Sequence, residues 1–162
     1  HPFEYPYMAA GRKAPDRMPK LLAAHAAQLD ALDEDAPVVL CGKSMGSRVG
    51  CHLSLERTDV RGLVCFGYPL GRNPEKLRDQ VLIDLRVPVL FIQGTRDPLC
   101  SLDALERVRG QMAAASTLHV VPDGNHSLEV AKRTLKATGT SQADHDAAML
   151  AAVQTFVSGL PQ

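Results

Sequence analysis

Four short apolar segments, rich in β-branched residues and bounded by glycine or proline, constrain the fold of this sequence more than any other feature. They cover residues 37–42, 61–67, 87–94 and 117–122. Three of them lack regular alternation of polar and apolar residues, which is typical of strands buried on both faces of a parallel sheet. The fourth is shorter and more mixed, as expected of an edge strand.

Helical patterns lie between these segments, with apolar residues repeating at three- to four-residue spacing. They fall at residues 18–32, directly after Ser44, at 102–112 and at 143–157. Strand and helix therefore alternate along the chain, which indicates βαβ units with right-handed crossovers. We predict an α/β fold, a three-layer α/β/α sandwich with a mostly parallel sheet.

Local signals set the expected helix ends. Asp16 is the expected N-cap of the first helix and Ser101 that of the third, and Ser141 with Asp144 forms a capping-box pattern before the last. The polar residues 132–142 are expected to form a surface loop. No repeat or linker interrupts the pattern, so residues 1–162 are predicted to be a single domain.

Composition excludes several classes of protein. The 162 residues carry 18 basic and 18 acidic side chains, so the chain lacks the basic surplus of a dedicated nucleic-acid binder. No apolar run approaches the roughly 20 residues of a membrane-spanning helix, and the first residues do not resemble a signal peptide. The four cysteines have no C-x-x-C spacing and are expected to be reduced, which favours a cytoplasmic protein.

The sequence VVLCGKSMGSRVG at residues 38–50 fits two motifs. Gly42-Lys43-Ser44 could end a phosphate-binding loop, but that loop needs a glycine at position 37, where Pro37 stands. The alternative is the G-x-S-x-G nucleophile elbow, a tight turn between a strand and a helix. The flanking patterns favour the elbow, with Gly42 and Gly46 expected to be small because neighbouring backbone passes close by.

A nucleophilic serine needs a base, and the base needs a carboxylate that orients it. Asp97 lies just after the third apolar segment, and His126 lies in the turn after the fourth. The order serine, acid, histidine and the placement after strand ends both agree with a triad of Ser44, Asp97 and His126. Asp123 is a rival acid, but its position suggests that it shapes the turn.

The segments GKSMGS, GTRDP and DGNHSL resemble the nucleophile, acid and histidine segments of the α/β-hydrolase superfamily. The resemblance is to small bacterial hydrolases related to dienelactone hydrolases, and it covers nearly the whole chain. It implies the α/β-hydrolase fold, with Ser44 as nucleophile, Asp97 as acid and His126 as base, acting on acyl bonds.

The sequence departs from that family before residue 3. The family places further strands there, with an HG-type loop that gives a second oxyanion donor, and no such loop occurs in this sequence. The strand at 38–42 would then be an uncovered sheet edge, which predicts self-association. We expect an N-terminally truncated fold, the C-terminal part of the full one. The sequence would then be a fragment of a longer protein, the alternative being that another chain covers the edge.

The predicted activity is that of a serine hydrolase cleaving esters, thioesters or related acyl bonds of a small molecule. The alternative is a non-catalytic, hydrolase-like binding or scaffold module. No metal or organic cofactor and no nucleic-acid or membrane partner is expected. The Met45 N–H is the expected oxyanion donor. Candidate pocket residues are Lys43, Tyr5, Tyr7 and Tyr68.

Overall fold

The computed structural model describes residues 1–32, 37–73 and 75–161. Packing divides the chain into two units, His1–Pro37 and Val38–Gln162. The second unit contains the sheet and all three residues of the predicted triad. The prediction of one domain over the whole chain stays a prediction.

The described residues of the first unit form two helices, α1 (Pro6–Ala9) and α2 (Met18–Asp30). An aromatic cluster joins them, in which the Tyr5 ring packs edge-on against Phe3 and its hydroxyl lies 3.1 Å from Nδ1 of His25. The prediction that Asp16 caps helix α2 was wrong. Helix α2 begins after Arg17 without a side-chain cap, because the Asp16 carboxylate instead pairs with Arg12 and Lys20.

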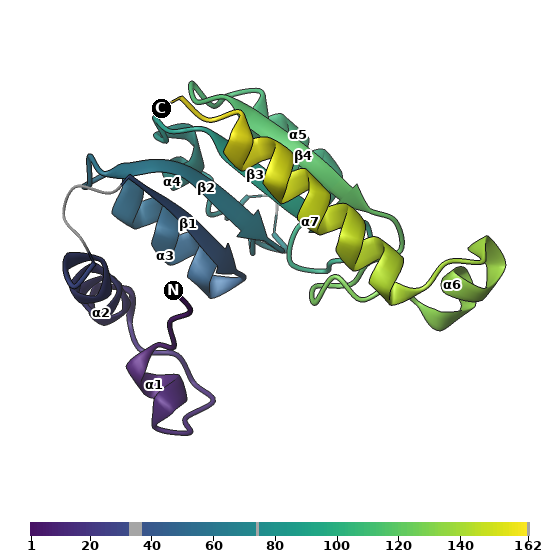
Figure 1. Cartoon of the computed structure of the whole chain (residues 1–162), viewed down its shortest axis with the longest axis horizontal. Helices are drawn as coiled ribbons and strands as arrows, with labels where there is room; N and C mark the ends of the chain where they lie inside the picture. Colours follow the sequence, from purple (N-terminus) through teal and green to yellow (C-terminus); the bar gives the residue numbers. More distant parts are fainter. Residues whose placement is uncertain (33–36, 74, 162) are drawn as a thin grey trace. The chain divides into compact units, whose positions relative to one another are not determined.

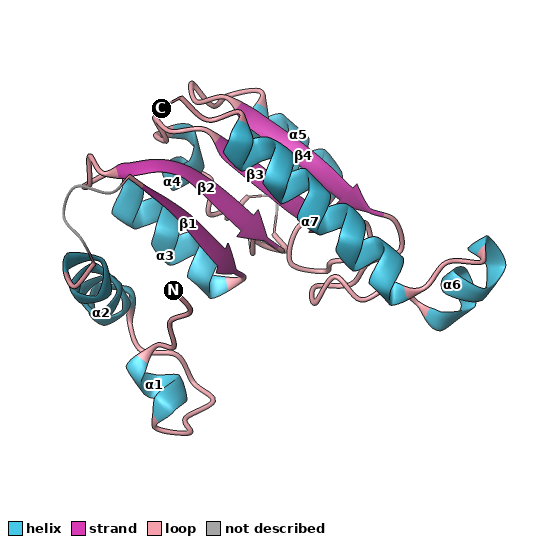
Figure 2. Ribbon diagram, in the orientation of Figure 1, coloured by secondary structure: helices cyan, strands magenta, loops and turns pink. Residues whose placement is uncertain are grey.

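The second unit is built on a four-stranded parallel sheet, seen in Figures 1 and 2. Its strands are β1 (Val38–Lys43), β2 (Val60–Phe66), β3 (Val89–Gly94) and β4 (Ser116–Val121). Their order in space is their order in the sequence, and each neighbouring pair is parallel. The four predicted strands are confirmed to within two residues, and β1 and β4 form the edges of this sheet.

Helices cover both faces of the sheet, as the three-layer prediction requires (Figure 1). Helix α7 packs on one face, where its Met149 joins Val64, Leu90 and Ile92 in a buried cluster. Helix α3 packs on the other face against β1 and β2. The helices of this unit are α3 (Met45–Ser54), α4 (Gln80–Ile83), α5 (Leu102–Arg109), α6 (Lys132–Thr138) and α7 (Gln142–Ser158).

Two of the predicted helix starts are confirmed. The Ser101 hydroxyl accepts from the Ala104 N–H at the start of α5, and Ser141 and Asp144 form the reciprocal capping box of α7. The loop predicted at 132–142 was wrong, because residues 132–138 form α6. With a single large apolar side chain, Leu135, this helix is too short to show periodicity. Among the described residues, no helix combines the length and apolarity needed to cross a membrane.

Candidate active site

Ser44 occupies the turn that joins β1 to α3. Its backbone has φ 51° and ψ −114°, a region that costs a non-glycine residue about 1–3 kcal/mol. The Ser44 N–H donates to the Phe66 carbonyl over 2.8 Å and so extends the pairing of β1 with β2 by one residue. The sheet thus holds the serine in a strained turn at the carboxyl end of β1.

The tightness of this turn explains one flanking glycine but not the other. A Cβ atom on Gly42 would overlap the backbone of Gly46 and Ser47, so only glycine fits there. Apart from its two chain neighbours and the backbone of its own helix, a Cβ on Gly46 would meet no atom of the described residues within 4 Å. The expectation that residue 46 must be small was therefore wrong. The backbone of Gly46 is what crowds Gly42, whereas the position of a side chain on residue 46 is open.

Asp97 lies in the loop that follows β3, with its side chain fully buried. Its Oδ1 atom accepts from the Leu99 N–H over 2.8 Å. The preceding residue, Arg96, donates its N–H to the Gly124 carbonyl over 2.9 Å. The acid-bearing loop is therefore tied by its backbone to the loop that carries His126.

His126 lies in a turn after β4 that is fixed by side-chain hydrogen bonds. The Asn125 Oδ1 atom accepts from the backbone N–H groups of Ser127 and Glu129, at 2.7 and 3.1 Å. From the start of α7, Gln142 accepts from the Val130 N–H over 2.9 Å. These contacts limit movement of the histidine before any substrate binds.

The three predicted residues meet in one hydrogen-bonded chain. His126 Nδ1 lies 2.8 Å from Asp97 Oδ2, and His126 Nε2 lies 2.9 Å from the Ser44 hydroxyl. With a proton on Nδ1, the ring donates to the carboxylate and Nε2 is free to accept from the serine. This is the arrangement in which a histidine can take the serine proton.

The negative charge of Asp97 affects the pKa of a neighbouring thiol, that of Cys100. Burial, and secondarily the negative charge of Asp97, raise the pKa of Cys100 to about 12. The Cys100 N–H also contacts the Asp97 carbonyl over 3.4 Å. Cys100 is therefore a neutral thiol beside the carboxylate and leaves the Asp97 charge to act on His126.

A family model described as an alpha/beta hydrolase domain matches residues 1–158 of this sequence. The chain belongs to the alpha/beta hydrolase family. The match covers almost the full length and agrees with the parallel sheet flanked by helices. Membership of this family supports hydrolase activity.

Solved structures of the same fold share little sequence with this alpha/beta hydrolase domain. A protein of unknown function from Agrobacterium tumefaciens has a TM-score of 0.66 at 17% identity, over 93% of this chain and 67% of that one. A serine hydrolase involved in carbazole degradation has a TM-score of 0.62 at 15% identity, and the match covers 88% of this chain and 74% of that one. A serine hydrolase homologue from Coxiella burnetii has a TM-score of 0.59 at 15% identity, and the match covers 71% of this chain and 54% of that one. The chain thus spans between about half and three quarters of these proteins.

Two residues beside the three predicted ones were missed by the sequence analysis. Gln93 of β3 donates from Nε2 to Asp97 Oδ2 over 2.6 Å. Gly67, just after β2, has φ +56°, and a Cβ there would lie 2.9 Å from the His126 carbonyl oxygen. A polar residue within the apolar segment 87–94 was a usable signal for Gln93, whereas nothing in the sequence marks Gly67.

The other candidate residues of this alpha/beta hydrolase domain differ in placement. Met45 begins α3, so its N–H is among the first four of the helix, which have no partner within it. Lys43 ends β1 and is exposed. Tyr68 is fully buried, and its hydroxyl donates to the Arg78 carbonyl over 3.2 Å, which is the environment of a packing residue. The pocket roles of Lys43, Tyr68 and the two first-unit tyrosines stay predictions.

The rival acid has a different partner. Asp123 accepts a hydrogen bond from the Thr134 hydroxyl at the start of α6, and its N–H donates to the Thr95 hydroxyl over 2.8 Å. Its φ is 55°, in the left-handed region. Asp123 thus shapes the turn before His126, as its position in the sequence suggested.

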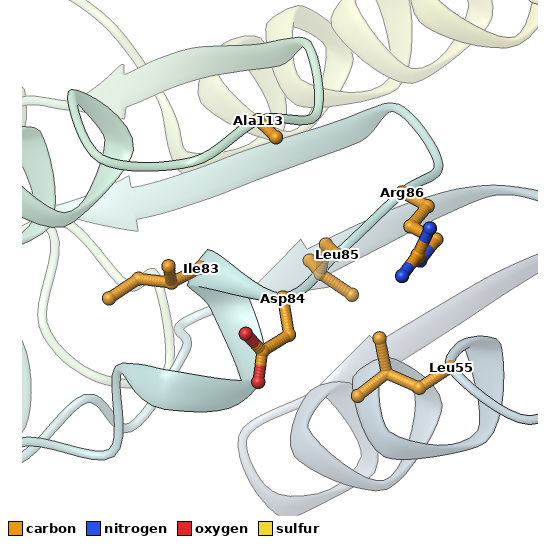
Figure 3. Close-up of a pocket in the computed structure, with 6 residues that line it drawn as sticks. All are labelled: Leu55, Ile83, Asp84, Leu85, Arg86 and Ala113. Atoms are coloured by element: carbon orange, nitrogen blue, oxygen red, sulfur yellow. The ribbon is translucent and has the colours of Figure 1, made fainter.

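A surface depression of about 490 Å³ lies at the other end of the strands (Figure 3). Leu85 and Arg86, which line it, precede β3, and Ala113 precedes β4. Because all four strands are parallel, their amino ends lie opposite the carboxyl ends that carry Ser44, Asp97 and His126. This depression is therefore separate from the candidate active site.

Proposed function

We propose that this chain is a serine hydrolase that cleaves an ester, thioester or related acyl bond of a small molecule. The observation that supports this most is the continuous hydrogen-bonded chain from Ser44 through His126 to Asp97, with both distances below 3 Å. A serine hydroxyl becomes a useful nucleophile when an adjacent base can remove its proton. The strained turn between β1 and α3 also supports Ser44 as the nucleophile.

In the first step, the Ser44 Oγ atom forms a bond to the acyl carbon while its proton moves to His126 Nε2. The carbonyl π electrons move to oxygen, and the Met45 N–H at the start of α3 donates to that oxyanion. Asp97 stabilises the imidazolium through Nδ1. The ten-residue helix adds the partial positive charge of its N-terminus.

In the second step, the bond to the leaving alcohol or thiol breaks and His126 returns the proton to it. A water molecule then attacks the acyl-serine, giving its proton to the same histidine. Release of the acid regenerates the Ser44 hydroxyl. Each proton that His126 accepts is returned within the cycle. No atom changes its oxidation state in either step, so the reaction needs no redox partner.

The test is labelling with a fluorophosphonate, followed by measurement of the intact mass. An activated serine displaces fluoride from phosphorus, so we expect one adduct on the wild-type chain and none on Ser44→Ala. Ser54→Ala is the matched control, because Ser54 lies at the end of the same helix and donates to the Cys51 carbonyl. It should label like the wild type.

A folded wild-type chain that gains no adduct and does not hydrolyse p-nitrophenyl acetate would contradict the proposal and favour a non-catalytic module. An adduct that persists in Ser44→Ala would contradict the assignment of the nucleophile. Circular dichroism of each variant would show whether loss of labelling accompanies loss of fold.

A further inference from the structure

Gln93 is a polar residue in the most buried strand of the sheet. All six residues of β3 are buried, and the side chain of Gln93 is fully inaccessible to solvent. A buried primary amide stabilises a fold only when its donors and acceptor are satisfied, and an unsatisfied group costs about 1–3 kcal/mol. A leucine or methionine would fill the same space without that cost.

The amide of Gln93 is satisfied on one side. Its Nε2 atom donates to Asp97 Oδ2 over 2.6 Å. Its Oε1 atom is buried and has no hydrogen-bond partner within residues 1–32, 37–73 and 75–161. The reverse orientation of the amide would place two oxygens against each other, so the donation from Nε2 is the assignment that the geometry supports.

The oxygen that accepts from Gln93 is the one that faces the histidine. Asp97 Oδ2 accepts from both Gln93 Nε2 and His126 Nδ1, at 2.6 and 2.8 Å. Oδ1 accepts from the Leu99 N–H. The two contacts from Gln93 and Leu99 hold opposite oxygens, which stops the carboxylate from rotating about its Cβ–Cγ bond.

We propose that Gln93 is a positioning residue for the active site, which holds Asp97 Oδ2 in line with His126 Nδ1 at a cost in stability. This inference rests on the proposed function of the triad. Gln93 touches neither substrate nor the reacting serine and acts through Asp97. In the part of the chain that the structure describes, His126 and Cys100 are titratable groups that lie against the Asp97 carboxylate.

The test compares wild type with Gln93→Met, which keeps the length of the side chain and removes the donor. We expect an unchanged or higher Tm, because an unsatisfied amide is removed from the core. We also expect the second-order rate of fluorophosphonate labelling to fall about 10–100-fold, since small misplacements in a catalytic group have effects of this size. Ser54→Ala is the control that loses a buried hydrogen bond away from Asp97.

A second variant, Gln93→Glu, separates loss of the hydrogen-bond donor from any effect of Gln93→Met on folding. Gln93→Glu has the shape of glutamine and can donate to Asp97 only when protonated. Burial and the neighbouring carboxylate both raise the pKa of the introduced carboxyl. The labelling rate of Gln93→Glu relative to wild type should therefore rise as the pH falls. The relative rate of Gln93→Met should not change with pH.

An NMR measurement makes the test independent of activity. The proton shared by His126 Nδ1 and Asp97 gives a resonance far downfield, which Gln93→Met should broaden or remove through faster exchange with water. If wild type shows the downfield resonance, Gln93→Met broadens or loses it, and wild type is not labelled, the proposed function fails and the role of Gln93 stands. If the resonance and the labelling rate of Gln93→Met both match wild type, or if both variants lose activity only in proportion to folded protein, Gln93 is not a positioning residue.

Discussion

His126 Nε2 lies 2.9 Å from the Ser44 hydroxyl, although 82 positions separate the two residues in the sequence. The contact exists because β1 and β4 are parallel members of one sheet and both residues follow the carboxyl end of their strand.

Asp97→Asn should lower kcat/KM for p-nitrophenyl acetate about 10⁴-fold. The amide cannot accept from His126 Nδ1 and Gln93 Nε2 with the strength of a carboxylate, so the ring loses its orientation and its tautomer. Asp123→Asn is the matched control, since it alters the other carboxylate near His126 and keeps an acceptor for Thr134. A larger loss in Asp123→Asn than in Asp97→Asn would reverse the assignment of the acid.

Gly42→Ala and Gly46→Ala should have opposite effects on stability. The added Cβ at position 42 overlaps the backbone of the turn, which should cost about 3 kcal/mol or more. At position 46 the Cβ has open space and alanine favours the helix, which should add up to about 1 kcal/mol. Urea denaturation of both variants measures the difference. Equal destabilisation would mean that the turn needs glycine at both positions.

Gly67→Ala should reduce activity more than its effect on stability explains. Gly67 and Gly139 both have positive φ, at +56° and +68°, so alanine strains the backbone by about 1–2 kcal/mol at either position. Only the Cβ at position 67 would press on the His126 carbonyl, and Gly139→Ala is therefore the control for strain alone. We expect the labelling rate to fall about 100-fold in Gly67→Ala. Equal rates in the two folded variants would show that Gly67 does not set the position of His126.

The buried thiols should resist alkylation in the native protein near pH 8. A hydrogen bond with Cys51 and burial raise the pKa of Cys65 well above the usual range, and burial raises that of Cys100 to about 12. Both therefore stay protonated at a pH below those values, and the thiol form is unreactive. Cys41 is exposed. Iodoacetamide followed by peptide mapping should modify Cys41 first, and early modification of Cys65 would contradict the packing of β2 against α3.

The sequence predicted those features that depend on local pattern and on chain order. Continuous apolar segments identified the four strands, and the placement of Asp97 and His126 after strands predicted which side chains would meet. Features that depend on contacts between distant backbones were missed. Gly67 is required by a carbonyl group 59 positions away, in His126, and α6 is too short for its apolar spacing to be visible. Gln93 could have been noticed as a polar residue among apolar ones, but its partner was visible only in the folded sheet.

The spread of Ser44, Asp97 and His126 over three strand ends means that no local segment of this chain contains an activated serine. A turn between β1 and α3 that has already formed still holds an ordinary hydroxyl until β4 docks and brings His126 to it. Ser44 therefore stays unreactive during synthesis and early folding, when an activated serine could react with other molecules. Its reactivity in a denaturant series would report the population of molecules in which the sheet has fully assembled.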